Sequence, residues 1–103
     1  MFFWDVTEVR SHFLVRIYAV DAWTFGAGDP VSGHSVLLEI ARVFSELNKQ
    51  GWKPRRTIVI ASWDAEEYAL IGSVEFVESY YSTLQARAVA YINLDVAVHI
   101  INK

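Results

Sequence analysis

Apolar and polar residues come in blocks along the chain, and three of the apolar blocks have the length and composition of β-strands. Residues 13–20, FLVRIYAV, are rich in β-branched and aromatic side chains and predict a strand. Residues 57–61, TIVIA, form a continuous apolar run, which is typical of a strand buried on both faces of a parallel sheet. Residues 88–95, AVAYINLD, predict a third strand that ends on an acid.

The segments between these strands predict two helices. From Ser32 to Gln50 the apolar residues recur every three or four positions, with Ser32 as the expected N-cap and Gly51 as the expected stop. A second helix is predicted from Ser73 through VEFVESYYSTL. Residues 24–33 carry three glycines and one proline and predict a loop. The order of elements therefore predicts an α/β fold with a β-α-β-α-β core and helical crossovers.

Carboxylates follow each predicted strand. Asp29 lies in the loop after the first strand, Glu66 and Glu67 follow the second, and Asp95 closes the third. Because ligands of such sheets bind outside the carboxyl ends of the strands, we expect these acids to gather at one edge. The pattern alone leaves two interpretations open: a metal or acid–base site, and ordinary loop charges and helix caps.

Composition narrows the functional classes. A chain of 103 residues with 53% hydrophobic residues predicts one ordered domain that leaves part of its apolar surface exposed. A net charge of −3 gives no electrostatic reason to expect binding to nucleic acid. The chain has no cysteine, which excludes disulfides and thiolate metal ligands, and no stretch of the length and apolarity of a membrane span is found.

Three stretches resemble the peptidase domain of the glutamate carboxypeptidase II family, which includes the non-catalytic transferrin receptor. They are DAWTFGAGDPVSG (21–33), GWKPRRTIVIASWDAEEYALIGSVEFVE (51–78) and AVAYINLD (88–95). The resemblance implies part of a three-layer α/β/α sandwich of a zinc exopeptidase. It divides the chain into an unmatched N-terminal segment (1–16), a partial zinc-peptidase domain (17–98) and an unmatched tail (99–103).

The resemblance also implies roles for the acids at a site with two zinc ions. Asp29 matches the carboxylate that bridges the two ions, while Glu67 and Asp95 match terminal ligands of one ion each. Glu66 matches the general base, and Asp21 matches an acid that orients a histidine ligand. Glu67 would then hold metal, and the adjacent Glu66 would accept a proton.

Two further positions match ligands of a structural calcium ion in the family. They are Glu75 and Glu78 on the second predicted helix, where a plain solvated helix face is the favoured alternative.

The chain also departs from the family at its histidines. Ala19 stands where the family has its first histidine ligand, and the second histidine ligand lies in a region beyond Lys103. His34 is the candidate replacement, although a packing role is the favoured interpretation. We expect surface or packing roles for His12 and His99.

The resemblance therefore implies a fragment of a zinc-dependent metallopeptidase that hydrolyses peptides through a metal-activated water and is inactive alone. The alternative is a non-catalytic binding or dimerisation module like the transferrin receptor. A third interpretation is self-association or aggregation without a function of its own. In the family the partners are a peptide substrate and a second copy in a homodimer, and the members are type II membrane proteins.

Overall fold

The computed structural model describes residues 2–3, 12–17 and 21–98, and in the first two ranges only the backbone. This part of the chain contains four strands and three helices. In chain order they are β1 (Phe2–Phe3), β2 (His12–Ile17), α1 (Val31–Lys49), β3 (Thr57–Ser62), α2 (Ile71–Ser79), α3 (Tyr81–Arg87) and β4 (Ala88–Asn93). The predicted α/β class is confirmed.

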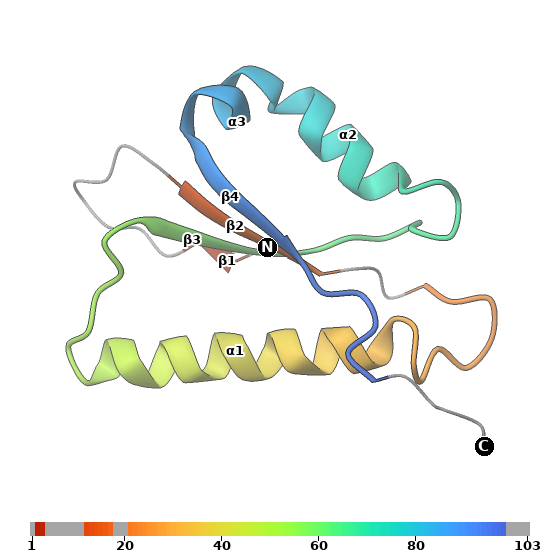
Figure 1. Ribbon diagram of the computed structural model, residues 1–103, viewed down its shortest axis with the longest axis horizontal. Helices are drawn as coiled ribbons and strands as arrows, with labels where there is room; N and C mark the ends of the chain where they lie inside the picture. Colours follow the sequence, from red (N-terminus) through yellow and green to blue (C-terminus); the bar gives the residue numbers. More distant parts are fainter. Residues whose placement is uncertain (1, 4–11, 18–20, 99–103) are drawn as a thin grey trace.

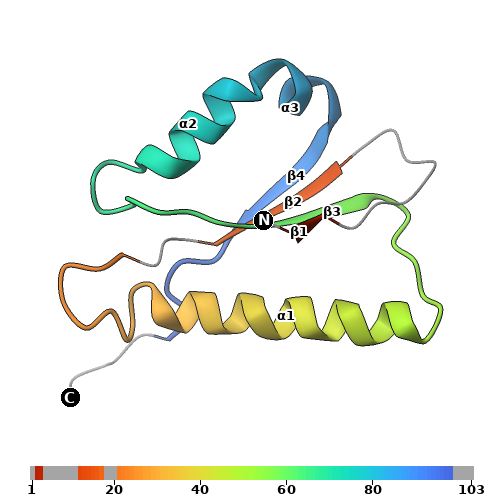
Figure 2. The same ribbon diagram turned by 180° about the vertical axis from the view of Figure 1, so that it is seen from behind.

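The strands form one mixed sheet in the order β1-β3-β2-β4. β2 lies between β3 and β4 and is parallel to both, as the β-α-β-α-β pattern predicts. β1 pairs with β3 in the antiparallel direction, which the sequence pattern did not indicate. Helix α1 runs along one face of the sheet, and α2 and α3 lie on the opposite side (Figure 1; Figure 2 shows the same arrangement from behind).

The two-sided arrangement of the helices follows from the handedness of parallel crossovers. The chain moves from β2 to its neighbour β3 through α1, and then from β3 back across β2 to β4 through α2 and α3. Right-handed crossovers in opposite lateral directions place their helices on opposite faces. The reversal creates a switch point between β2 and β3, at whose carboxyl ends ligands of such sheets bind.

The core lies between α1 and the sheet. Leu37 and Ile60 are both buried there, and four partly buried apolar residues pack against them: Ala41, Phe44, Ile58 and Leu94. Val59 and Ala61, which alternate with Ile60 along β3, are buried as well. β3 is therefore buried on both faces, as its continuous apolar sequence predicts.

The C-terminal end of α1 confirms the predicted stop at Gly51. Gly51 has a positive φ of 91°, and its amide donates to the carbonyl of Asn48. The amide of Trp52 donates to the carbonyl of Leu47, which completes the Schellman arrangement of a helix end. The ring of Trp52 stacks on Phe44 with a centroid distance of 5.8 Å and covers the last turns of the helix.

The predicted N-cap of α1 is wrong. The helix begins at Val31 with Pro30 at the cap position, and the amide of His34 donates to the carbonyl of Pro30. Ser32 is therefore already inside the first turn. Its hydroxyl donates to the carbonyl of Gly28 and accepts the amide of Ala97, so it serves tertiary structure rather than capping.

The second predicted helix is also corrected, because the structure contains two short helices in its place. α2 begins at Ile71, two residues before the expected start, and ends at Ser79. Tyr80 leaves helical geometry with φ −112° and ψ 17°, and α3 follows at once. Aromatic and hydroxyl residues are weak helix formers, and the segment 79–82 consists of four of them, SYYS.

Helices α1, α2 and α3, the helices of the described residues, all lack the combined length and apolar character that a membrane crossing requires. The division of the chain at residues 16 and 98 stays a prediction, and residues 18–20, at the end of the first predicted strand, lie outside the described part.

Two neighbouring leucines of α1 test where the core lies. Leu37 is 2% exposed, whereas Leu38 is 57% exposed. We expect Leu37→Ala to lower the free energy of unfolding by about 2–5 kcal/mol, since it leaves a cavity beside Ile60. Leu38→Ala, the matched control, should change it by less than about 0.5 kcal/mol. Urea denaturation followed by circular dichroism measures both values, and equal losses would contradict this core.

Candidate functional site

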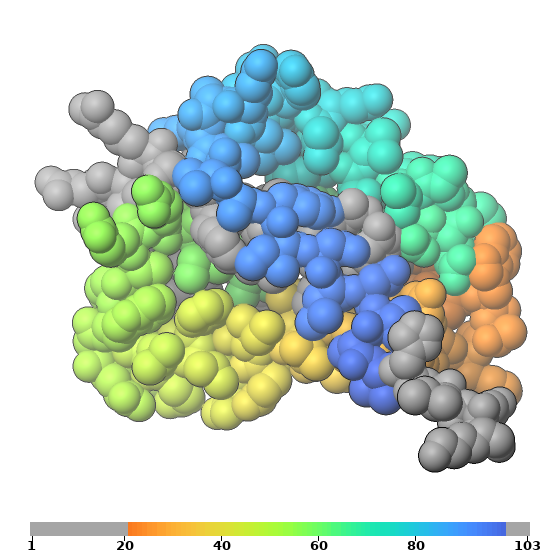
Figure 3. All heavy atoms as spheres, viewed as in Figure 1, coloured from red at the N-terminus to blue at the C-terminus, as the bar shows by residue number. Residues whose placement is uncertain are grey.

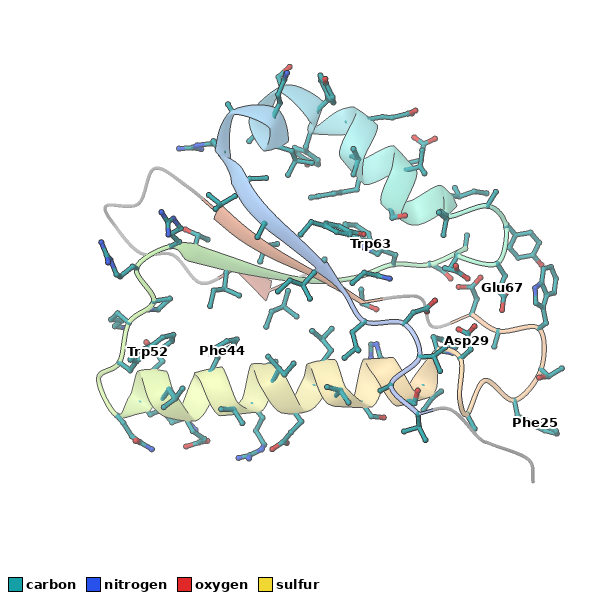
Figure 4. All side chains as sticks on the ribbon, in the orientation of Figure 1. Phe25, Asp29, Phe44, Trp52, Trp63 and Glu67 are labelled. Atoms are coloured by element: carbon teal, nitrogen blue, oxygen red, sulfur yellow. The ribbon has the colours of Figure 1, made fainter. Side chains whose placement is uncertain are left out.

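The loop after β2 is tied to the loop after β3 by the side chain of Asp21. One carboxylate oxygen of Asp21 accepts the backbone amide of Glu66 at 3.1 Å, and the other accepts the amide of Glu67 at 3.3 Å. These bonds hold the adjacent glutamates at the switch point between the two strands. Figure 4 shows Glu67 and Asp29 at this same end of the sheet, with Phe25 directed away from it.

The loop that carries the two glutamates makes an unusually tight turn. Three of its residues other than glycine have left-handed backbone geometry, with φ of 57° at Ala65, 70° at Ala69 and 62° at Leu70. The carbonyls of Ala65 and Glu66 accept the amides of Ile71 and Leu70, which closes the turn on itself. Such strained residues cost about 1 kcal/mol or more each and cluster at functional sites.

Asp95 is held against the first turn of α1. A side chain at Gly33 would collide with the backbone carbonyls of Leu94 and Asp95, so the helix approaches this segment closely. The hydrogen bond from the amide of Ala97 to Ser32 fixes the same segment from the other side. Asp29 stands directly before α1 and is exposed. The first turn of α1 therefore joins the loop after β2 to the end of β4.

Four carboxylates surround Glu66 closely enough to affect its ionisation. Partial burial raises the pKa of Glu66, and the negative charges of Asp95, Glu67, Asp29 and Asp21 raise it further, in that order of effect. The expected gathering of acids at one sheet edge is therefore present in the structure. A carboxylate with a raised pKa is better suited to accept and return a proton than an ordinary surface glutamate.

The arrangement does not by itself fit a catalytic zinc centre. Across residues 21–98, whose side chains the structure describes, no three histidine, aspartate or glutamate side chains converge as metal ligands. The gathered groups are all carboxylates, whereas catalytic zinc sites keep three protein ligands, commonly with histidine. Carboxylate oxygens suit harder cations as well. The metal-binding roles of Asp29, Glu67 and Asp95 stay predictions.

Other candidate residues lie apart from the gathered acids. Glu75 and Glu78 are exposed on α2, as a solvated helix face requires. His34 is half-buried, and its Nδ1 atom has no hydrogen-bond partner in the described part of the chain. His12 is the first residue of β2, and Ala19 and His99 lie outside the described residues.

Sequence reasoning missed the residues that bring the loops together. Gly33 and Gly72 both lie in the first turn of a helix, and a side chain at Gly72 would meet the backbone of Asp64. A glycine inside a helical pattern signals close approach of another backbone, and that signal was available in the sequence. A second omission is an exposed aromatic pair, Trp23 and Tyr68, whose ring centroids lie 5.2 Å apart across the two loops.

Comparison of the sequence with known proteins assigns the chain to a family. The sequence profile of peptidase family M28 matches residues 4–100, nearly the whole chain. This chain belongs to peptidase family M28. The resemblance inferred from its motifs is thereby confirmed.

Individual members of the family are similar over three quarters of the chain. A probable glutamate carboxypeptidase of Arthroderma benhamiae is 62% identical over 79 residues, which are 76% of this chain and 11% of that protein. A probable glutamate carboxypeptidase of Arabidopsis thaliana is 63% identical over 78 residues, 76% of this chain and 12% of the relative. The aminopeptidase NAALADL1 of Mus musculus is 60% identical over 79 residues, 76% and 11% of the two chains. The chain thus spans about a ninth of the length of these relatives.

Two glycines test the close contact between α1 and the end of β4. We expect Gly33→Ala to destabilise the protein by about 1–3 kcal/mol, because the added methyl group collides with the carbonyls of Leu94 and Asp95. Gly28→Ala is the matched control, since nothing lies within 4 Å of the position of its added atom. Thermal denaturation of the two variants gives the comparison, and an unchanged midpoint for Gly33→Ala would refute the contact.

The hydrogen bonds of Asp21 allow a second test. Asp21→Ala removes the acceptor of two amides. We therefore expect faster hydrogen exchange at Glu66 and Glu67 and a free energy of unfolding that is lower by about 1–3 kcal/mol. Asp21→Asn removes the same charge but keeps one acceptor oxygen, so its loss should be smaller. Asp64→Ala is the control, because Asp64 bonds only its neighbouring amide at Ala65 among the side-chain bonds described. Hydrogen exchange followed by NMR measures the protection of the Glu66 and Glu67 amides. Protection that is unchanged in Asp21→Ala would contradict these hydrogen bonds.

Proposed function

We propose that this chain carries the carboxylate part of the active site of a glutamate-carboxypeptidase-like, zinc-dependent metallopeptidase. The observation that supports the proposal most directly is the Asp21 tie, which fixes Glu66 and Glu67 at the carboxyl end of β3 among the other acids. Membership in a peptidase family and the names of the similar proteins agree with it. The described elements would form part of a three-layer α/β/α sandwich.

The roles proposed for the acids follow from their positions. Asp29, at the start of α1, would bridge two zinc ions, and Glu67 and Asp95 would each hold one of them. Bound zinc would supply a Lewis acid for the peptide carbonyl and a water of lowered pKa. Glu66, whose pKa is raised by partial burial and by the neighbouring carboxylates, is the residue suited to take a proton from the attacking water and deliver it to the leaving amine.

Hydrolysis requires more metal ligands than the described residues provide. Three ligating side chains do not converge within residues 21–98, and alanine at position 19 cannot bind a metal ion. We therefore propose that the carboxylates contribute to peptide hydrolysis only together with ligands from elsewhere, and that the chain alone is inactive. Glu75 and Glu78 as calcium ligands stay a separate proposal, with no supporting contact in the described residues.

A second candidate function is a non-catalytic binding or dimerisation module related to the transferrin receptor. The lack of a convergent ligand set among the described side chains favours it. The retention of adjacent Glu66 and Glu67, tied by Asp21 in a strained turn, favours the peptidase interpretation. A module without catalytic work gains nothing from gathering like charges, which repel each other.

A metal titration distinguishes these functions. We expect calorimetry of the purified chain to show saturable but weak binding of zinc, with a dissociation constant of about 0.1 mM or weaker, and little preference over magnesium. Glu67→Ala should abolish this binding. Glu39→Ala, which removes an exposed glutamate of α1 paired with Arg42, should leave it unchanged. Peptide hydrolysis by the chain alone should not exceed that of buffer.

Two results of that titration would overturn the proposal. Zinc binding that is equal in the wild type and in Glu67→Ala would place the metal elsewhere. No saturable binding at millimolar zinc would leave the carboxylates without a role in metal binding, which favours the non-catalytic module. Binding at micromolar zinc, by contrast, would show that a nitrogen ligand such as His34 completes the site.

A further inference from the structure

The hydroxyl of Ser32 joins two segments that lie far apart along the chain. It donates a hydrogen bond to the backbone carbonyl of Gly28 and accepts one from the backbone amide of Ala97, at 2.9 Å. The first partner lies in the loop after β2, and the second lies 65 residues beyond Ser32, in the segment after β4. One small side chain in the first turn of α1 therefore connects these two segments.

Each of the two segments carries one of the gathered carboxylates. Asp29 directly follows the residue whose carbonyl accepts the hydroxyl, and Asp95 lies two positions before the residue whose amide donates to it. The negative charges of Asp29 and Asp95 both act on the carboxyl group of Glu66, so the two acids lie at the same end of the sheet. The hydrogen bonds of Ser32 are therefore made within two residues of both acids.

A hydroxyl group is suited to this connection because it donates one hydrogen bond and accepts another at the same time. The two bonds run in one direction, from the amide of Ala97 through the oxygen of Ser32 to the carbonyl of Gly28. Hydrogen bonds in such a chain polarise and strengthen one another. Loss of the hydroxyl removes both bonds together, and an apolar side chain replaces neither of them.

The backbone beside Ser32 also holds the segment after β4. The next residue, Gly33, is buried, and a side chain there would collide with the backbone carbonyls of Leu94 and Asp95. Figure 3 shows the last described residues, in blue, lying directly against the start of α1. The contact at Gly33 sets how closely the helix and the segment approach, and the bonds of Ser32 fix where the segment lies on the helix.

We propose that Ser32 is a positioning residue of the carboxylate site, and that its hydroxyl sets Asp29 and Asp95 relative to one another. This role rests on the proposed function, since it names a further residue of that same site. Asp21 does the same for the loop after β3, where its carboxylate accepts the amides of the two adjacent glutamates. Together the two side chains join the loop after β2 to the loops that follow both neighbouring strands.

A purely structural role for Ser32 predicts a different result from a positioning role. A hydroxyl that only stabilises the fold lowers the free energy of unfolding when it is lost, but the folded chain keeps its affinity for metal. A hydroxyl that positions the two carboxylates weakens metal binding by the folded chain itself when it is lost. The dissociation constant for zinc, measured where every variant is folded, separates the two roles.

Ser35 provides the matched control. Its hydroxyl also donates to the carbonyl four residues before it, at Val31, and this bond stays within α1. Ser32→Ala should raise the dissociation constant for zinc about tenfold, as loss of a residue that orients metal ligands does, whereas Ser35→Ala should leave it unchanged. Ser32→Thr keeps the hydroxyl and should bind zinc like the wild type. NMR titration of the purified chain with zinc chloride measures each constant, and circular dichroism verifies folding.

Hydrogen exchange without metal tests the connection itself. In Ser32→Ala the amide of Ala97 should exchange up to about tenfold faster than in the wild type, because its acceptor is lost. Ser32→Cys keeps the size of the side chain with a weaker donor and acceptor, so it should give an intermediate rate. It also provides the comparison if the alanine variant does not fold. Ser35→Ala should exchange at Ala97 like the wild type.

The two measurements separate a failure of this role from a failure of the proposed function. Zinc binding that depends on Glu67 but is equally strong in Ser32→Ala would overturn the positioning role and leave the proposed function intact. An unchanged exchange rate at Ala97 in Ser32→Ala would show that the hydroxyl does not hold the segment after β4. A wild-type chain without saturable zinc binding would overturn the proposed function, and the positioning role with it, because no site would be left to position.

Discussion

The parallel pairing of β2 with β3 on one side and with β4 on the other is the constraint on which the rest of this structure depends. Parallel strands end at the same edge, so the loops that leave all three strands must meet there. Because β3 and β4 lie on opposite sides of β2, the two crossovers run in opposite lateral directions. This places α1 on one face of the sheet and α2 and α3 on the other. The positions of the core and the acids both follow from this central strand.

The sequence predicts these features where the local signal agrees with the global arrangement. The buried strand at 57–62, the long helix and its stop at Gly51 are local patterns, and the structure contains all three. The approach of Glu66 to Asp95 follows from the order of the parallel strands, because β3, β2 and β4 are neighbours and end at the same edge. Patterning and topology were therefore sufficient for most of the fold and for the proximity of these two acids.

The remaining features depend on contacts between distant segments and could not be predicted from a local window. Ser32 has the composition of an N-cap, but its hydroxyl bonds to Gly28 and Ala97, the latter 65 residues away. The break at Tyr80 between α2 and α3 is not marked by the apolar periodicity of this segment either. Family resemblance assigned roles to single acids, yet only an arrangement in space shows whether their oxygens converge. Among the described residues, no three of these side chains converge as metal ligands.

The hydrogen bonds from the amides of Glu66 and Glu67 to Asp21 span sequence separations of 45 and 46 residues. Closing so long a loop costs conformational entropy that no local turn returns, so these bonds form only after β2, α1 and β3 have come together. Until then the carboxylates are spread along an open chain, where solvent and salt screen them from one another. The electrostatic repulsion among these acids is therefore a property of the folded state and is largely absent from the unfolded chain. The gathered charge therefore lowers the stability of the native state, and the packing of the sheet and α1 has to outweigh that cost.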